Sequence, residues 1–204
     1  MSEARARLLS TASRLFYAEG LHAVGIDRII STAGVTRATL YRHFPAKDDL
    51  VVAYLAQSDE TIRARAAEAR THGKSPEEVI RAVAAGIAED IQRPGFRGCA
   101  FINAAAEYPD PAHPVHRAVM RHRDWFFTTA AQLFGETGKP DAEPAAHHFV
   151  MLRDGAMAAG CLADPALVCE TLTRGVEGLL VYRSRESKRI EMVAPSKSAH
   201  GTPS

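Results

Sequence analysis

Along most of the chain, apolar residues recur at steps of three and four positions, which places them on one face of an α-helix. No stretch shows the alternation expected of a strand, so the pattern predicts an all-α fold. Gly20, Gly34 and Pro45 fall between stripes, where a turn must end one helix and start the next. Nine helices are expected, over residues 4–19, 26–32, 37–43, 48–70, 76–92, 98–108, 115–134, 143–162 and 165–189.

The composition narrows the class of protein. Of the 204 residues, 46% are hydrophobic and 24% are charged, which is ordinary for a globular chain and excludes collagen, disulfide scaffolds and full disorder. The three cysteines form no Cys-x-x-Cys pair, which fits a reducing compartment. No apolar run approaches the roughly 18 residues that span a bilayer. We therefore expect a cytoplasmic protein with no membrane segment and a disordered polar tail at residues 194–204.

The distribution of charge is more informative than the net charge of +1. Residues 28–47 hold four lysines and arginines and no acidic residue. The same window predicts two short helices joined by a glycine turn, the pattern of a helix-turn-helix motif. A solvated surface helix with ordinary charges is the alternative interpretation. If the motif binds DNA, the candidate contacts are Arg28, Thr36, Arg37, Ala38, Thr39, Tyr41, Arg42, His43 and Lys47.

Within this set, chemistry suggests different contacts. An arginine can bind guanine with two hydrogen bonds in the major groove, so Arg37 is the candidate for base recognition. Thr39 can touch a thymine methyl group or donate to a phosphate. The side chains of Tyr41, His43 and Lys47 are suited to phosphate oxygens, which position a protein on DNA without specifying the sequence.

The stretch Ala33-Gly34-Val35-Thr36-Arg37-Ala38-Thr39-Leu40-Tyr41-Arg42-His43-Phe44-Pro45-Ala46-Lys47-Asp48-Asp49-Leu50 closely resembles the DNA-binding segment of the tetracycline-repressor (TetR) family. The similarity extends from Leu8 to Leu55, about a quarter of the chain. Gly25 departs from the pattern, because such proteins often have a Ser or Thr cap there, but glycine is a tolerable cap.

The resemblance implies a DNA-binding transcriptional regulator rather than an enzyme, most simply a repressor. It implies a helix-turn-helix domain at residues 1–47 and a helical ligand-binding and dimerisation domain at residues 48–193. The expected partners are an inverted-repeat DNA operator, a small apolar effector and a second copy of the chain. The last two helices would form the dimer interface, through Ala156, Ala159, Gly160, Leu172, Val176, Leu179 and Leu180.

The effector pocket is less visible in the sequence. Residues 98–109 resemble the pocket-lining helix of a subgroup of these regulators, and the candidate pocket residues are Cys99, Phe101, Asn103, Glu107, Trp125, Met151 and Met157. Core packing is the alternative role for the tryptophan and the methionines. Asn103 lies within an apolar run and needs a polar partner, which is either the effector or the backbone.

The sequence also offers residues for two other functions, metal binding and catalysis. The histidines at 113, 116, 122, 147 and 148 lack the i, i+4 spacing of two ligands on one helix, so no metal site or cofactor is predicted. A metal- or redox-responsive regulator of the same fold stays open. A helical enzyme using Cys99 and a histidine is another alternative, although no nucleophile motif or catalytic residue is evident. Arg153-Asp154 and residues 121–124 are interpreted as solvated or interfacial charges.

Overall fold

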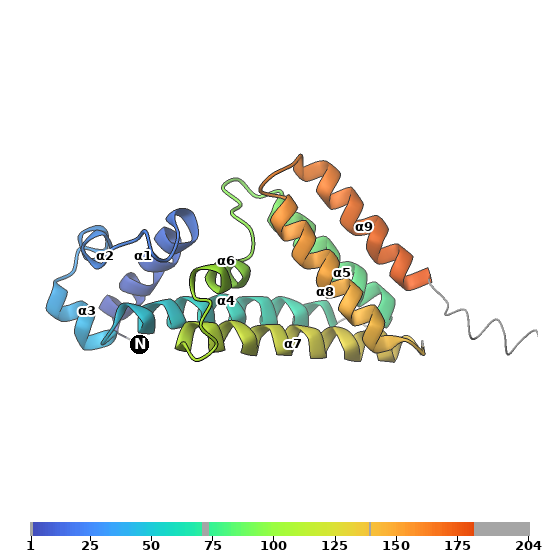
Figure 1. The fold of residues 1–204 in the computed structure, drawn as a ribbon, viewed down its shortest axis with the longest axis horizontal. Coiled ribbons are helices and arrows are strands. Elements are labelled where there is room, and N and C mark those ends of the chain that lie inside the picture. Colours follow the sequence, from blue (N-terminus) through green and yellow to red (C-terminus); the bar gives the residue numbers. More distant parts are fainter. Residues whose placement is uncertain (1, 71–73, 139, 182–204) are drawn as a thin grey trace, which may run out of the picture.

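The computed structural model describes residues 2–70, 74–138 and 140–181, and these residues form nine α-helices and no strand. The helices, shown in Figure 1, are α1 Glu3–Glu19, α2 Ile26–Ala33, α3 Arg37–His43, α4 Lys47–Arg70, α5 Pro76–Ile91, α6 Ala100–Glu107, α7 Pro114–Glu136, α8 Ala142–Ala159 and α9 Pro165–Val181. The all-α prediction is confirmed. The predicted tail at 194–204, and the part of the ninth helix beyond residue 181, lie outside the described residues.

The helix ends follow local chemistry. The Ser75 hydroxyl accepts the backbone N–H of Glu78, whose carboxylate accepts the N–H of Ser75, and this capping box starts α5. Pro114 and Pro165 occupy the first positions of α7 and α9, where a missing N–H costs nothing. The helix predicted for 143–162 ends instead at Ala159. Beyond it, the N–H groups of Cys161 and Leu162 donate to carbonyls three residues earlier, as in a tight turn, and not four residues earlier as in an α-helix.

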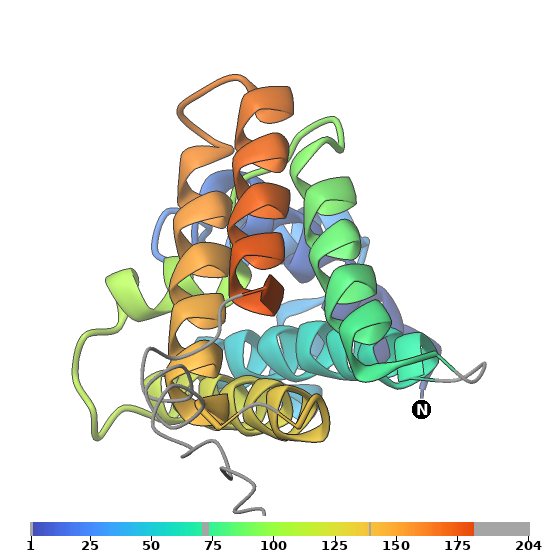
Figure 2. The same cartoon turned by 90° about the vertical axis from the view of Figure 1, so that its right-hand side faces the viewer.

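The molecule is elongated, with helices α1 to α3 at one end (Figure 1). Helix α4 starts there and runs along the molecule beside α7. Figure 2 shows α5, α8 and α9 standing side by side at the other end, across α4 and α7. Helix α6 lies over the middle, between the N-terminal helices and this stack.

A continuous apolar core connects the two ends. In the N-terminal helices it is built around Leu8, Phe16 and Leu40, and α4 extends it through Leu50 and Leu55. At the far end it continues with buried side chains of α5, α6 and α7, among them Ile80, Ile91, Phe101 and Phe134. Helix α4 is thus the structural link between both parts. No helix in the described ranges is long and apolar enough to cross a bilayer.

Candidate nucleic-acid interface and internal cavities

Helices α2 and α3 form a helix-turn-helix unit at one tip of the molecule. Gly34 adopts a left-handed conformation, with φ 63°, and ends α2 at a position that disfavours side chains. Thr36 caps α3 by accepting the Thr39 N–H at 3.1 Å, and the two hydroxyls are 2.9 Å apart. On the inner face of α3, Leu40 and the following Phe44 are buried. The outer face presents the exposed side chains of Arg37, Ala38, Tyr41 and Arg42.

The surroundings of α3 are less strongly positive than the sequence suggests, because two of the arginines pair with acidic residues. The Arg37 guanidinium pairs with Asp27, and Arg28 pairs with Glu19 at 3.4 Å. Asp27 directly precedes the acid-free window of residues 28–47 and Glu19 lies nine residues before it, and the fold places both beside arginines of the window. Because these pairs are exposed, each contributes only about 0–1 kcal/mol to stability. Either arginine can therefore exchange its carboxylate partner for a DNA phosphate.

Two further candidate cations at this tip, His43 and Lys47, have polar partners. The His43 ring nitrogen Nε2 is 3.2 Å from the Ser2 hydroxyl, which ties the end of α3 to the start of α1. The Lys47 ammonium donates to the His22 carbonyl at 3.4 Å. Burial lowers the pKa of Lys47. Both groups therefore help to hold the unit together as well as being candidates for phosphate contacts.

Three of the larger hollows in the described part of the chain lie away from this tip. The junction cavity, of about 510 Å³, lies between α1 and α6 and is lined by Tyr17, Asn103 and Glu107, among others. The inner cavity, of about 340 Å³, lies between α4, α8 and the loop before α6, with Cys99 and Arg153 in its wall. The α8–α9 groove, of about 700 Å³, is lined almost entirely by small and apolar residues of these two helices.

Similarity to known proteins identifies the family of the chain. A family model described as bacterial regulatory proteins, tetR family, matches residues 8–54, which contain most of α1, all of α2 and α3, and the start of α4. The solved structure of SCO4454, a TetR-family transcriptional regulator from Streptomyces coelicolor, has 62% sequence identity and a TM-score of 0.86. That similarity covers 88% of this chain and 95% of SCO4454. The chain belongs to the TetR family.

Other relatives agree with this assignment. A putative TetR transcriptional regulator (sav143) from Streptomyces avermitilis has 29% identity and a TM-score of 0.75, over 89% of this chain and 100% of that one. The regulator LmrA from Bacillus subtilis is 33% identical over 39% of this chain, a match that spans 43% of LmrA. The chain thus matches less than half of the length of LmrA. TetR-family members are DNA-binding transcriptional regulators, and this chain carries their N-terminal helix-turn-helix fold.

The seven residues predicted for a TetR effector pocket do not form one wall. Cys99, Phe101 and Met157 line the inner cavity, whereas Asn103 and Glu107 line the junction cavity. Met151 is 71% exposed and lies in the α8–α9 groove. It is two positions before Arg153, about 200° around the helix, so the two side chains leave α8 on opposite sides. Trp125 lines none of these hollows and packs under the Arg63 guanidinium, 4.3 Å from the ring centre.

The polar partner of Asn103 is the backbone. Its side-chain amide donates to the Arg97 carbonyl at 2.8 Å, and the residue is exposed rather than buried in an apolar run. Glu107, on the same helix, holds the N-terminal unit: its carboxylate accepts the Leu21 N–H at 2.9 Å and the His22 N–H at 2.6 Å. Helix α6 is therefore bonded directly to the loop between α1 and α2.

Two polar residues of the C-terminal part are buried against expectation. The sequence predicts solvated or interfacial positions for Arg153 and His122, but both are buried, so a solvated position is wrong for each. The apolar stripe of α8 contained the signal, because Arg153 falls four positions after Phe149 and four before Met157. The His122 Nδ1 atom lies 2.7 Å from an Asp59 carboxylate oxygen. Burial lowers the pKa of His122, although the hydrogen bond to Asp59 opposes this.

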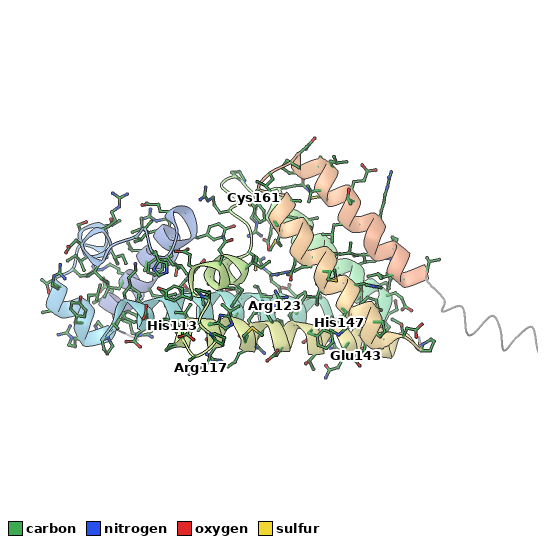
Figure 3. All side chains as sticks on the ribbon, in the orientation of Figure 1. His113, Arg117, Arg123, Glu143, His147 and Cys161 are labelled. Carbon is green, nitrogen blue, oxygen red and sulfur yellow. The ribbon has the colours of Figure 1, made fainter. Side chains whose placement is uncertain are left out.

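The other histidines serve separate contacts. His113 pairs with Asp48 at 3.2 Å, and His116 Nδ1 is 2.8 Å from the Tyr108 carbonyl. Figure 3 shows His113 at the start of α7 and His147, beside Glu143, at the far end of the molecule. Across the described residues, no group of three His, Cys, Asp or Glu side chains is arranged to hold a metal ion.

The α8–α9 groove contains part of the predicted dimer interface. Four of the seven residues expected there line it: Ala156, Ala159, Leu172 and Leu179. Leu172 and Val176 are each only 2% exposed in the protomer, so they contribute little accessible surface. The groove also presents Met151 and Leu167, which are exposed, and the small residue Gly155.

Proposed function

We propose that this TetR-family protein is a repressor that binds an inverted-repeat DNA operator as a dimer and is released by a small, largely apolar effector. The observation that carries this proposal is the exposed outer face of α3, anchored from behind by Leu40 and Phe44. A helix presented in this way fits the major groove, which is about 12 Å wide. The proposed contact residues are Arg28, Thr36, Arg37, Ala38, Thr39, Tyr41, Arg42, His43 and Lys47.

Base recognition is assigned to Arg37, at the first position of α3. Its ion pair with Asp27 is exposed, so DNA binding requires only that a phosphate or a guanine replaces the carboxylate. The phosphate contacts are assigned to Tyr41, His43 and Lys47. Thr36 and Thr39 already hydrogen-bond each other, so their contribution to DNA binding is chiefly to fix the start of α3.

The proposed functions are assigned to two consecutive parts of the chain. Residues 1–47 bind DNA, and residues 48–193 bind the effector and form the dimer, with the α8–α9 groove as the contact face. Helix α6 links the two proposed sites. Its Phe101 lines the inner cavity, and its Glu107 accepts hydrogen bonds from the α1–α2 loop. An effector that displaces α6 would then alter the position of the N-terminal unit.

The proposal is tested by selecting binding sites from a random duplex library with the full-length protein, followed by footprinting. We expect an inverted repeat with half-site centres about 34–36 Å apart, or a multiple of that distance. Selection of a site without internal symmetry would contradict the dimeric proposal, and absence of any enriched site would contradict DNA recognition.

Two variants separate specificity from affinity. Arg37→Ala should weaken binding to the selected site by about 1–3 kcal/mol and relax one base preference, whereas Lys47→Ala should weaken all duplexes alike. Arg174→Ala is the matched control, because Arg174 is an exposed arginine of α9, at the end of the molecule away from α3. Equal effects of Arg37→Ala on selected and random duplexes would remove its base-reading role.

A further inference from the structure

The inner cavity, of about 340 Å³, lies within the size range of small-molecule sites. It adjoins a smaller hollow of about 100 Å³ between α4 and α5, and the two share the side chains of Ile62, Arg65, Asp90, Arg153 and Met157. A molecule in the inner cavity would therefore contact α4, α8 and the loop before α6 together.

The wall of this cavity carries an excess of positive charge. Its charged residues are three arginines and one aspartate. Asp90 is shared between Arg65 and Arg93, at 3.0 and 3.1 Å. Asp154, just outside the wall, is in turn shared between Arg153 and Arg123, at 2.8 Å each. Four guanidinium groups thus share two carboxylates, which leaves this set of six charged groups with a net charge of +2.

Arg153 differs from the other three arginines because it is buried. Its side chain is 6% exposed, against 34% or more for Arg65, Arg93 and Arg123, which water can solvate. One nitrogen of Arg153, Nη1, donates to Asp154, while Nη2 donates to the Cys99 sulfur at 3.1 Å. A thiol is a weak acceptor, so one edge of a buried cation lacks the strong acceptor that such a group requires.

The remainder of the wall is largely apolar. Ile62, Phe101 and Met157 face the same cavity as Arg153, and the Phe126 ring lies 5.3 Å from the guanidinium carbon. We propose that the effector is an organic carboxylate with an apolar body, its carboxylate bound by Arg153 in place of the Cys99 contact. The apolar body would lie against Ile62, Phe101 and Met157. This inference rests on the proposed function and adds to it the charge of the effector.

The test uses three probes with one tail and three head groups: octanoate, 1-octanol and octylamine. Calorimetry with the full-length protein, without DNA, should give a dissociation constant for octanoate at least about tenfold lower than for 1-octanol, since a charge-assisted hydrogen bond is gained. Octylamine should bind more weakly than both, because its cation meets the excess arginine charge. Equal affinity for octanoate and 1-octanol, tightest binding of octylamine, or no binding of any probe would overturn the inference.

Variants locate the effect at Arg153. Arg153→Met keeps the length of the side chain and should reduce the octanoate preference to within about threefold, while Arg153→Lys should retain part of it. Arg121→Met is the control, because Arg121 is exposed on α7 and outside the cavity wall. A full octanoate preference in a folded Arg153→Met protein, with helicity checked by circular dichroism, would also refute the assignment.

The carboxylate site and the proposed function are tested by different measurements, so one can fail without the other. Operator binding by the effector-free protein tests the regulator, and calorimetry without DNA tests the carboxylate site. A protein that selects an inverted repeat but does not discriminate the head groups would remove only the inference. A protein that binds octanoate but selects no operator would instead remove the proposed function.

Discussion

The replacement of Leu167 by aspartate tests whether the α8–α9 groove is the dimer interface. Leu167 lines the groove and is 59% exposed in the protomer. It is the third residue of α9, where an aspartate is favourable because the helix N-terminus is partially positive. The substitution therefore leaves the protomer fold intact. Val176→Asp cannot serve, because that side chain is buried within the protomer and a charge there would unfold it.

The expected magnitude follows from the exposed fraction. Burial of a whole leucine side chain contributes about 1.5–3 kcal/mol, so covering the exposed part of Leu167 contributes about 1–2 kcal/mol. A two-fold interface contains two copies, which gives about 2–4 kcal/mol. The desolvation of two carboxylates adds about 1 kcal/mol or more. The dimer dissociation constant should rise by about two to three orders of magnitude.

Sedimentation over a range of protein concentrations measures this constant directly. Leu162→Asp is the matched control, since Leu162 is 87% exposed in the turn between α8 and α9 but lies outside the groove. We expect the control to dimerise as the wild type does. A Leu167→Asp dimer within threefold of the wild-type constant would refute the assignment of the groove. So would an equal loss in the control.

Three further predictions concern stability, each measured by thermal or denaturant unfolding. Burial lowers the pKa of His122, so the unfolded chain binds a proton at this histidine at a higher pH than the folded chain does. The free energy of unfolding should therefore fall as the pH drops below about 6.5, and it should fall less steeply in His122→Gln. Equal dependence of stability on pH in the two proteins would contradict this. Gly160→Ala should cost about 1–3 kcal/mol, since its new Cβ would lie 2.8 Å from a buried side chain, whereas Gly86→Ala, which meets no atom within 4 Å, should add about 0.5–1 kcal/mol; a neutral Gly160→Ala would argue against tight packing there. Asn103→Leu should cost about 0.5–1.5 kcal/mol by removing the bond to the Arg97 carbonyl and leave the effector response unchanged; unchanged stability with a blunted response would make Asn103 an effector contact.

The DNA-binding unit could be predicted closely because its determinants are local. The glycine that ends α2, the threonine that caps α3 and the apolar positions of α3 all lie within about ten residues of one another. Local hydrogen bonds and helical periodicity decide such a unit, so a pattern in the sequence is sufficient. What the pattern could not show was the return of Asp27 to Arg37, which depends on how α2 and α3 pack.

The cavities could not be predicted in the same way, because they are assembled from distant segments. Arg65, Asp90 and Arg153 belong to three helices, and only the tertiary packing brings them to one wall. Helical periodicity did indicate which face of α8 is buried, and Arg153 lies on it. Residue type favours solvent for an arginine, whereas the apolar stripe of α8 places Arg153 in the interior. A charged residue on an apolar stripe is better treated as a candidate site than as a surface group.

Helix α6 joins the inner cavity to the α1–α2 loop, and in the proposed mechanism this short apolar segment links effector binding to DNA binding. Cys99, which immediately precedes α6, contacts the buried Arg153, and Glu107 at the other end accepts two N–H groups of the α1–α2 loop. A carboxylate that replaced the Cys99 contact would act on the start of this helix. Hydrogen bonds of 2.6 and 2.9 Å tolerate little displacement, since their strength falls steeply with poor geometry. In the proposed mechanism, an effector that shifted α6 would therefore also shift or release the N-terminal helices, because Glu107 bonds α6 to the α1–α2 loop.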